Sequence, residues 1–136
     1  MDWKLIFLLS GFGLAMAVAT VFVIPPNIEP AFWLVIFLVC AYLIARSRSG
    51  VAPQRLFLHG LCVSLVNSVW ITAAHVLLFD QYMASHPQEA GMMTSMPGSP
   101  KLLMVLFGPI VGSISGLVLG LFAWVAGKVV KPAPAR

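Results

Sequence analysis

Hydrophobic side chains fill four long stretches of the chain, and polar side chains gather between them. The apolar stretches cover residues 5–24, 31–45, 56–79 and 102–127, and none of them contains Asp, Glu, Lys or Arg. A helix rises 1.5 Å per residue, so ~20 apolar residues cross a hydrocarbon layer of ~30 Å. Strands of a membrane β-barrel would instead alternate apolar and polar positions. The pattern predicts an all-α membrane protein with four transmembrane helices.

We expect these helices at about residues 5–24, 30–46, 56–80 and 101–128, in a single transmembrane domain that covers residues 1–136. Proline residues stand near several of the expected ends. Proline suits the first turn of a helix, where its missing N–H would have no partner anyway.

Two of the four runs allow a second interpretation. The second run is short for a full crossing, and the alternative is a buried or re-entrant segment. In the first run, Ala17-Val18-Ala19 resembles the cleavage site of a secretory signal. The apolar run continues through Ile24 without a polar region, which favours an uncleaved first helix.

Basic residues gather on one side of the predicted up-down-up-down bundle, the side that holds the amino terminus, the loop 46–55 and the tail. Seven of the eight Lys and Arg residues lie there: Lys4, Arg46, Arg48, Arg55, Lys128, Lys131 and Arg136. The other side, with a loop over residues 81–100, holds Lys101. Loops rich in Lys and Arg stay in the cytoplasm. We therefore predict that both termini and the loop 46–55 are cytoplasmic, in the inner membrane of a bacterium.

The composition excludes several classes of protein. Hydrophobic residues make up 60% of the chain and charged residues 9%, whereas soluble domains carry about 25% charged residues. A soluble domain and a disordered chain are therefore both excluded. The net charge of +4 follows from the basic loops and not from a folded basic face, so we expect a lipid bilayer as partner and no nucleic acid.

Small residues recur at every fourth position in two of the predicted helices. The rows are Gly108, Gly112, Gly116 and Gly120 in the fourth helix, and Gly11, Ala15 and Ala19 in the first. Such rows let helices approach closely, so that dispersion contacts hold them together in lipid. We expect both rows to be packing seams, within the chain or between subunits.

The third predicted helix carries the most polar residues. Placed at ~100° per residue, they share one arc of the helix; they are Ser64, Asn67, Ser68, Thr72 and His75. One interpretation is hydrogen bonding between helices inside the bundle. The other is a polar path or a substrate contact centred on Asn67, because polar residues in lipid are costly and often functional.

The loop 81–100 contains residues that suit a soft metal ion. Thioethers and imidazole are ligands for Cu(I), and this loop holds His86, Met92, Met93 and Met96. The alternative is a short interfacial helix over residues 89–93 whose methionines dip into lipid.

Catalytic signatures are absent from the sequence. It contains no G-x-S-x-G elbow and no glycine-rich phosphate loop. No acid lies within a span to complete a triad or to couple transport to protons. The alternative is a catalytic site assembled from Asp80, His86 and Glu89 in the outer loop. Because no signature supports it, we expect no enzyme and no cofactor.

Four short motifs, RSRSG, RLFLHG, VLLFDQYM and SHPQEAGMM, resemble a family of uncharacterised small bacterial inner-membrane proteins with four helices. They cover about a third of the chain. The resemblance implies the same four-helix topology and no activity.

The sequence leaves two hypotheses for function. The first is a non-enzymatic accessory or scaffold subunit that packs through the glycine row against a second copy, in a homo-oligomer, or against a larger membrane complex. The alternative is a small transporter or channel for a soft metal such as Cu(I), or for a small amphiphile bound between helices at the polar arc.

Overall fold

The structure is a computed structural model that describes residues 1–47 and 50–130 of the chain. Its six helices are α1 (Trp3–Phe22), α2 (Glu29–Ser47), α3 (Pro53–Leu77), α4 (Phe79–Ser85), α5 (Pro87–Ser95) and α6 (Pro100–Val129). Four of them, α1, α2, α3 and α6, are long and apolar enough to cross a membrane. The prediction of an all-α chain with four long apolar helices is confirmed. Arg48, Lys131 and Arg136, which entered the charge argument, lie outside the described residues.

Short-range contacts define several helix ends. The Asp2 side chain caps α1 by accepting a hydrogen bond from the Leu5 N–H at 3.1 Å. The Asp2 N–H donates in turn to Nε2 of His59 at 3.0 Å, while Nδ1 of His59 lies 2.6 Å from the Arg55 carbonyl oxygen. Because Nε2 accepts, Nδ1 carries the proton and donates to Arg55. His59 therefore ties the start of α1 to the first turns of α3.

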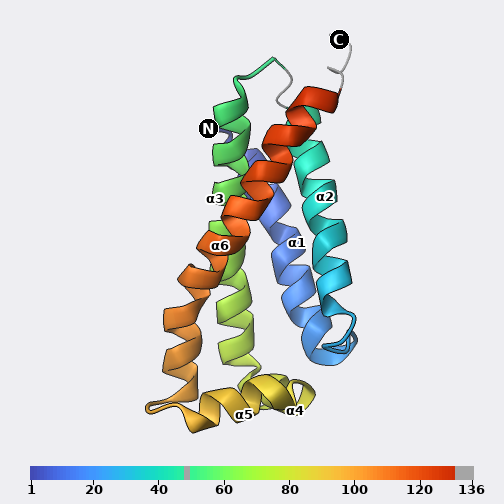
Figure 1. The fold of residues 1–136 in the computed structure, drawn as a ribbon. Helices are drawn as coiled ribbons and strands as arrows, with labels where there is room; N and C mark the ends of the chain where they lie inside the picture. The colour runs from blue at the N-terminus through green and yellow to red at the C-terminus, as the bar shows by residue number, and fades with distance from the viewer. Residues whose placement is uncertain (48–49, 131–136) are drawn as a thin grey trace.

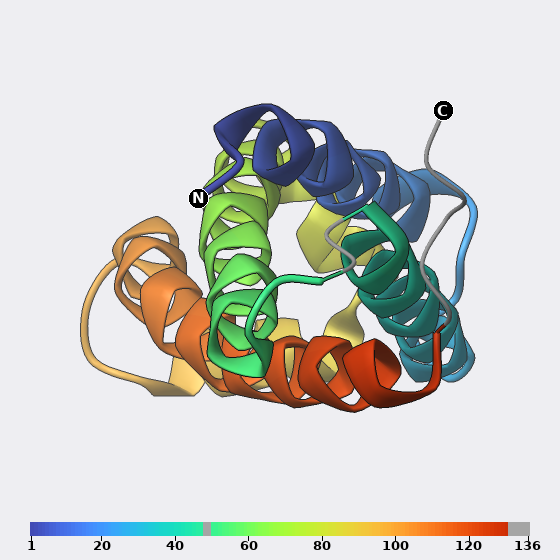
Figure 2. The same ribbon diagram turned by 90° about the horizontal axis from the view of Figure 1, so that it is seen from above.

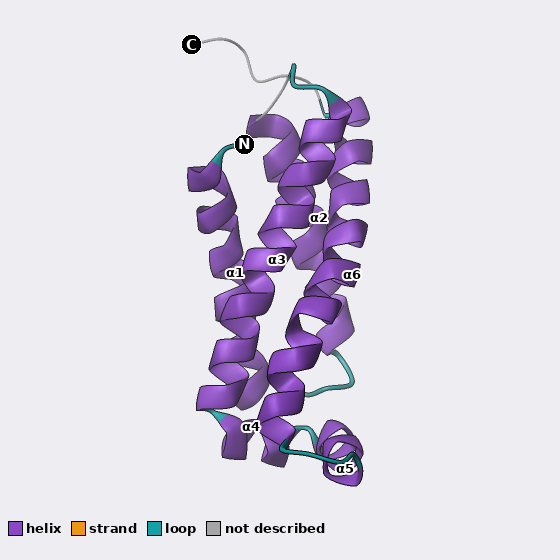
Figure 3. Ribbon diagram, turned by 90° about the vertical axis from the view of Figure 1, so that its left-hand side faces the viewer, coloured by secondary structure: helices purple, strands orange, loops and turns teal. Residues whose placement is uncertain are grey.

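Helix α3 stands at the centre of the packing. Its most extensive contact is with α6, and its second most extensive contact is with α1. Helix α2 packs mainly on α6. Consecutive helices α1 and α2 contact each other little. Figure 3 shows α3 between α1 and α6, and Figure 2 shows the four long helices arranged in a ring when viewed along the bundle. The connections alone therefore do not determine which helices are neighbours.

Helices α4 and α5 lie across one end of the bundle, opposite the end where α1 begins and α6 finishes (Figure 1). The sequence predicted a loop over residues 81–100, with a short helix over residues 89–93 as an alternative. The structure divides residues 79–95 into two helices that meet at His86, and the second of them, α5, includes the residues 89–93 of the alternative. Pro87 occupies the first turn of α5, where its missing N–H costs nothing and its ring favours a new helix.

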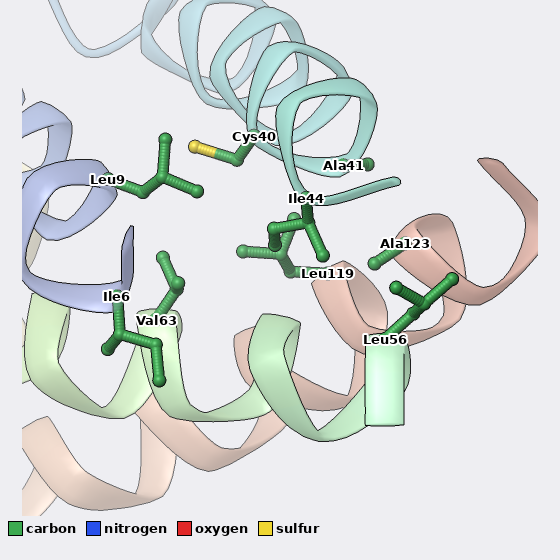
Figure 4. Packing of buried hydrophobic residues seen from close by; sticks show 9 residues of the cluster. All are labelled: Ile6, Leu9, Cys40, Ala41, Ile44, Leu56, Val63, Leu119 and Ala123. Atoms are coloured by element: carbon green, nitrogen blue, oxygen red, sulfur yellow. The ribbon is translucent and has the colours of Figure 1, made fainter. Parts of the chain in front are cut away.

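An apolar core fills the end of the bundle where α1 begins and α6 finishes. It combines the start of α1 and α3 with the last turns of α2 and α6 (Figure 4). Its buried members are Ile6, Leu9, Cys40, Ala41, Ile44, Leu56, Val63, Leu119 and Ala123. Because side chains from all four long helices interdigitate here, this half of the bundle is closed.

The glycine row of α6 faces α3. A Cβ at Gly108 would collide with Thr72, one at Gly112 with Ser68, one at Gly116 with Leu61 and one at Gly120 with Phe57. The two backbones also approach directly, since a Cβ on Gly60 of α3 would lie 2.8 Å from the backbone nitrogen of Gly120. The row is therefore a seam within the chain, and its glycine face is covered by α3.

The row of small residues predicted in α1 does not face the other helices of the bundle. Gly11 and Ala15 are exposed and Ala19 is half-buried. The small side of α1 that packs inward is instead formed by Ser10, Gly13, Ala17 and Thr20, all buried. A Cβ on Gly13 would meet the Asn67 side chain of α3, and Ser10 accepts a hydrogen bond from Nε1 of Trp70 at 3.2 Å. The inward face of α1 is therefore rotated away from the Gly11 row.

We predict that Gly116→Leu destabilises the protein by about 3 kcal/mol, at the upper end for overpacked sites. A Cβ at Gly116 would lie 3.1 Å from the Leu61 carbonyl oxygen, and backbone cannot move aside as a side chain can. The measurement is the free energy of unfolding in mixed micelles. Gly11→Leu is the matched control, because no atom lies within 4 Å of its Cβ position. Equal stability of the two variants would contradict the seam.

Candidate functional site

A cavity of about 650 Å³ lies in the half of the bundle that the apolar core leaves open. Its walls are the first half of α2, the second half of α3 and the first half of α6. Tyr82 of α4 and both Glu89 and Met93 of α5 line it at the covered end of the bundle. Cavities of ~300–1,000 Å³ are typical of sites for small organic ligands.

The polar arc of α3 forms one wall of this cavity. All five residues predicted for the arc line it: Ser64, Asn67, Ser68, Thr72 and His75. The walls opposite are largely apolar and include Trp33 and Phe37 of α2 and Met104 and Phe107 of α6. Gly108 and Gly112 add bare backbone where α6 meets α3. The cavity is therefore amphipathic, with one polar and two apolar walls.

The unpaired polar atoms of the protein concentrate in this lining. Within residues 1–47 and 50–130, four buried side-chain atoms have no hydrogen-bond partner: Ser64 Oγ, Asn67 Oδ1, His75 Nε2 and Glu89 Oε2. All four belong to residues that line the cavity. Leaving such an atom unpaired costs ~1–3 kcal/mol. Since hydrocarbon offers no compensating partner, their concentration at one place favours a site that receives a polar group.

Asn67 occupies the junction between the cavity and α1. It is 4% exposed, and a Cβ at Gly13 of α1 would lie 2.6 Å from its amide carbon. The absence of a side chain at Gly13 therefore makes room for Asn67. A larger residue at position 13 would therefore displace the Asn67 side chain from its place at the cavity wall.

Aromatic rings and a carboxylate form a cluster where the start of α2 lies near the end of α3 and the α4–α5 junction. The Tyr82 ring stacks between those of His75 and His86, at centroid distances of 4.1 and 4.3 Å. Nε2 of His86 lies 3.2 Å from Oε2 of Glu29. The other oxygen of Glu29, Oε1, accepts a hydrogen bond from Nε1 of Trp33 at 2.9 Å. The cluster joins the start of α2 to the α4–α5 junction.

His86 is a positioning residue in this cluster. Its side chain is almost fully buried, and Nδ1 lies 2.9 Å from Ser85 Oγ and 3.2 Å from the Tyr82 carbonyl oxygen. With Nε2 facing Glu29, both ring nitrogens have partners. His86 therefore orients Tyr82 and Glu29 and leaves no nitrogen for a ligand in the cavity.

Tyr82 remains a neutral hydrogen-bond donor. Burial raises the pKa of its phenol to about 12, and the nearby carboxylates Glu89 and Glu29 add to this effect by disfavouring a phenolate. The phenol therefore keeps its proton throughout the physiological range.

The residues predicted to hold a soft metal are dispersed. Met92 and Met96 are exposed, Met93 is half-buried in the cavity lining, and both nitrogens of His86 already have partners. Within the part of the chain that the structure describes, no cluster of three His, Cys, Asp or Glu side chains is arranged to hold a metal ion. Copper binding stays a prediction that this arrangement does not favour.

Three residues of the site, Glu29, Trp33 and Tyr82, were not among the predicted candidates, and Glu89 was considered only as part of a catalytic site with Asp80 and His86. The sequence places both glutamates near proline residues at presumed helix starts, where an acid is ordinary because it complements the helix dipole. Nothing local indicates that residues 29, 82 and 89 meet. Their convergence depends on how α4 and α5 fold back across the bundle.

No protein-family model, curated protein or solved structure matches the chain.

Proposed function

We propose that this protein is a non-enzymatic integral membrane protein that binds a small amphiphile in the cavity between α2, α3 and α6. One observation carries the proposal: every unpaired buried polar atom among the described side chains belongs to a residue lining this cavity. A ligand with a polar head would pair with the α3 wall and the α4–α5 end. Its apolar body would lie against Trp33, Phe37 and Phe107, as in other sites that combine apolar walls with a few polar groups.

The packing supports binding better than a scaffold or a pore. The glycine row lies against α3, which removes its support for a contact with a partner. The apolar core closes the half of the bundle away from α4 and α5, which is unfavourable for a continuous channel.

We further propose that both termini are cytoplasmic and that the cavity belongs to the outer half of a bacterial plasma membrane. Lys4, Arg46, Arg55 and Lys128 are placed near the end where α1 begins and α6 finishes, whereas Lys101 is at the α4–α5 end. This asymmetry is what the positive-inside rule associates with a cytoplasmic end. A ligand would then enter from the outer leaflet.

We predict that the protein in lipid nanodiscs binds the uncharged dye N-phenyl-naphthylamine saturably, beyond its partition into empty discs. Ser115→Phe should weaken this binding about tenfold, a loss of ~1.4 kcal/mol, because Ser115 lines the cavity and the ring would occupy ligand space. The measurement is a fluorescence titration.

Ser113→Phe is the matched control, since Ser113 is exposed on α6 and lies outside the lining. It should bind the dye as the unmodified protein does. Binding that never saturates, or an equal loss in both variants, would count against a ligand cavity.

We predict the membrane orientation from cysteine labelling in intact cells. In a chain whose Cys40 and Cys62 are replaced by Ala, a cysteine at exposed Ser95 of α5 should react with an impermeant maleimide. A cysteine at exposed Gln54, in the first turn of α3, should react only after permeabilisation. The reverse pattern would invert the topology, and labelling of both sites in intact cells would contradict it.

A further inference from the structure

The charged side chains that line the cavity are both carboxylates. They are Glu29 and Glu89, and no Lys or Arg belongs to the described lining. The basic residue at this end, Lys101, is exposed, and its ammonium lies 5.0 Å above the Phe79 ring centroid. An anionic head group would therefore meet the Glu89 carboxylate and no Lys or Arg of the described lining, while Glu29 is already paired with His86. The charge of the site favours a positive ligand.

The two carboxylates are not equivalent. Glu29 already accepts a hydrogen bond from Trp33 with one oxygen, and its other oxygen lies 3.2 Å from His86 Nε2. The Oε2 atom of Glu89 is buried and has no partner. A carboxylate oxygen accepts hydrogen bonds, so Oε2 of Glu89 offers an acceptor to a donor group on a ligand. Glu29 holds the end of the cavity together, and Glu89 is free to contact a ligand.

Aromatic rings also line the two apolar walls of the cavity. They are Trp33 and Phe37 of α2 and Phe107 of α6, whereas the two faces of the Tyr82 ring are covered by His75 and His86. The face of an aromatic ring attracts a cation within ~6 Å of its centroid. These rings can therefore accept an ammonium group that a purely aliphatic wall would reject.

The depth of the cavity suits an extended tail. Its polar wall runs from Ser64 to His75 along α3, a distance of ~16 Å at the helical rise. A compact inorganic cation would fill little of this length and would leave the apolar walls of α2 and α6 uncovered. A head group with N–H donors at Glu89 and an alkyl body along the apolar walls of α2 and α6 would use both parts.

We infer that the ligand of this cavity is an alkylammonium, a primary or secondary amine in its charged form with an apolar tail, whose head binds Glu89. The inference rests on the proposed binding function and specifies its ligand class. Ammonium N–H groups supply a donor for Glu89 Oε2, and the tail lies between α2 and α6.

The experiment compares three amphiphiles with the same tail. Each of decylammonium, decanol and decyl sulfate competes with N-phenyl-naphthylamine for the full-length protein in zwitterionic nanodiscs. The measured quantity is the mole fraction of each amphiphile in the bilayer that displaces half of the dye, corrected for partition into empty discs. We expect decylammonium to displace the dye at about one tenth of the decanol mole fraction, which corresponds to ~1.4 kcal/mol. Decyl sulfate should be weaker than decanol.

Two variants with the same change in charge locate the effect. Glu89→Gln should abolish the preference for decylammonium over decanol. Asp80→Asn should preserve it, because Asp80 is exposed on α4 and outside the lining. A preference that survives in Glu89→Gln overturns the inference.

The failure of the inference is distinguishable from that of the proposed function. If the dye binds saturably but decanol and decylammonium displace it equally, the cavity binds amphiphiles without regard to charge and the inference is wrong. If the dye does not bind saturably, the proposed function fails and the inference fails with it. The comparison of amphiphiles on the unmodified protein needs no variant to fold.

Discussion

The close approach of α6 to α3 is the interaction on which the rest of the structure depends. In lipid, helices gain little from burying apolar surface, so backbone proximity and dispersion must hold them together. Gly60 and Gly120 bring the two backbones into contact, and α1 and α2 then pack on opposite partners, α3 and α6. Consecutive helices α1 and α2 are held in place largely through this pair and not by each other.

This seam also divides the bundle into two halves with different properties. Where Leu119 and Ala123 of α6 meet Ile44 of α2, apolar side chains from four helices fill the space. Toward α4 and α5, the first half of α2 and the first half of α6 line a cavity. The polar arc of α3 begins in this second half, so the costly polar atoms face the cavity and not the lipid.

The covered end of the cavity depends on a small set of polar contacts. Glu29, Trp33 and His86 connect α2 to the α4–α5 junction, and Tyr82 stacks between two imidazole rings. These contacts pair both oxygens of Glu29, whereas Oε2 of Glu89 has no hydrogen-bond donor. One carboxylate of the cavity, Glu29, is therefore hydrogen-bonded within the protein, and the other, Glu89, has an oxygen that can accept a hydrogen bond from a cationic ligand.

The sequence by itself determined the four long helices, because continuous apolar runs of sufficient length have no other stable form in hydrocarbon. It also determined that the α3 polar residues and the α6 glycines each share a face, since both follow the helical period. Only the tertiary structure decided which faces meet. Periodicity describes the side chains of one helix and says nothing about its neighbours. It therefore predicted a packing row at Gly11, whereas the glycine of α1 that packs against α3 is Gly13. The meeting of Glu29, Tyr82 and Glu89 depends on how α4 and α5 cross the bundle, a long-range arrangement that no local pattern encodes.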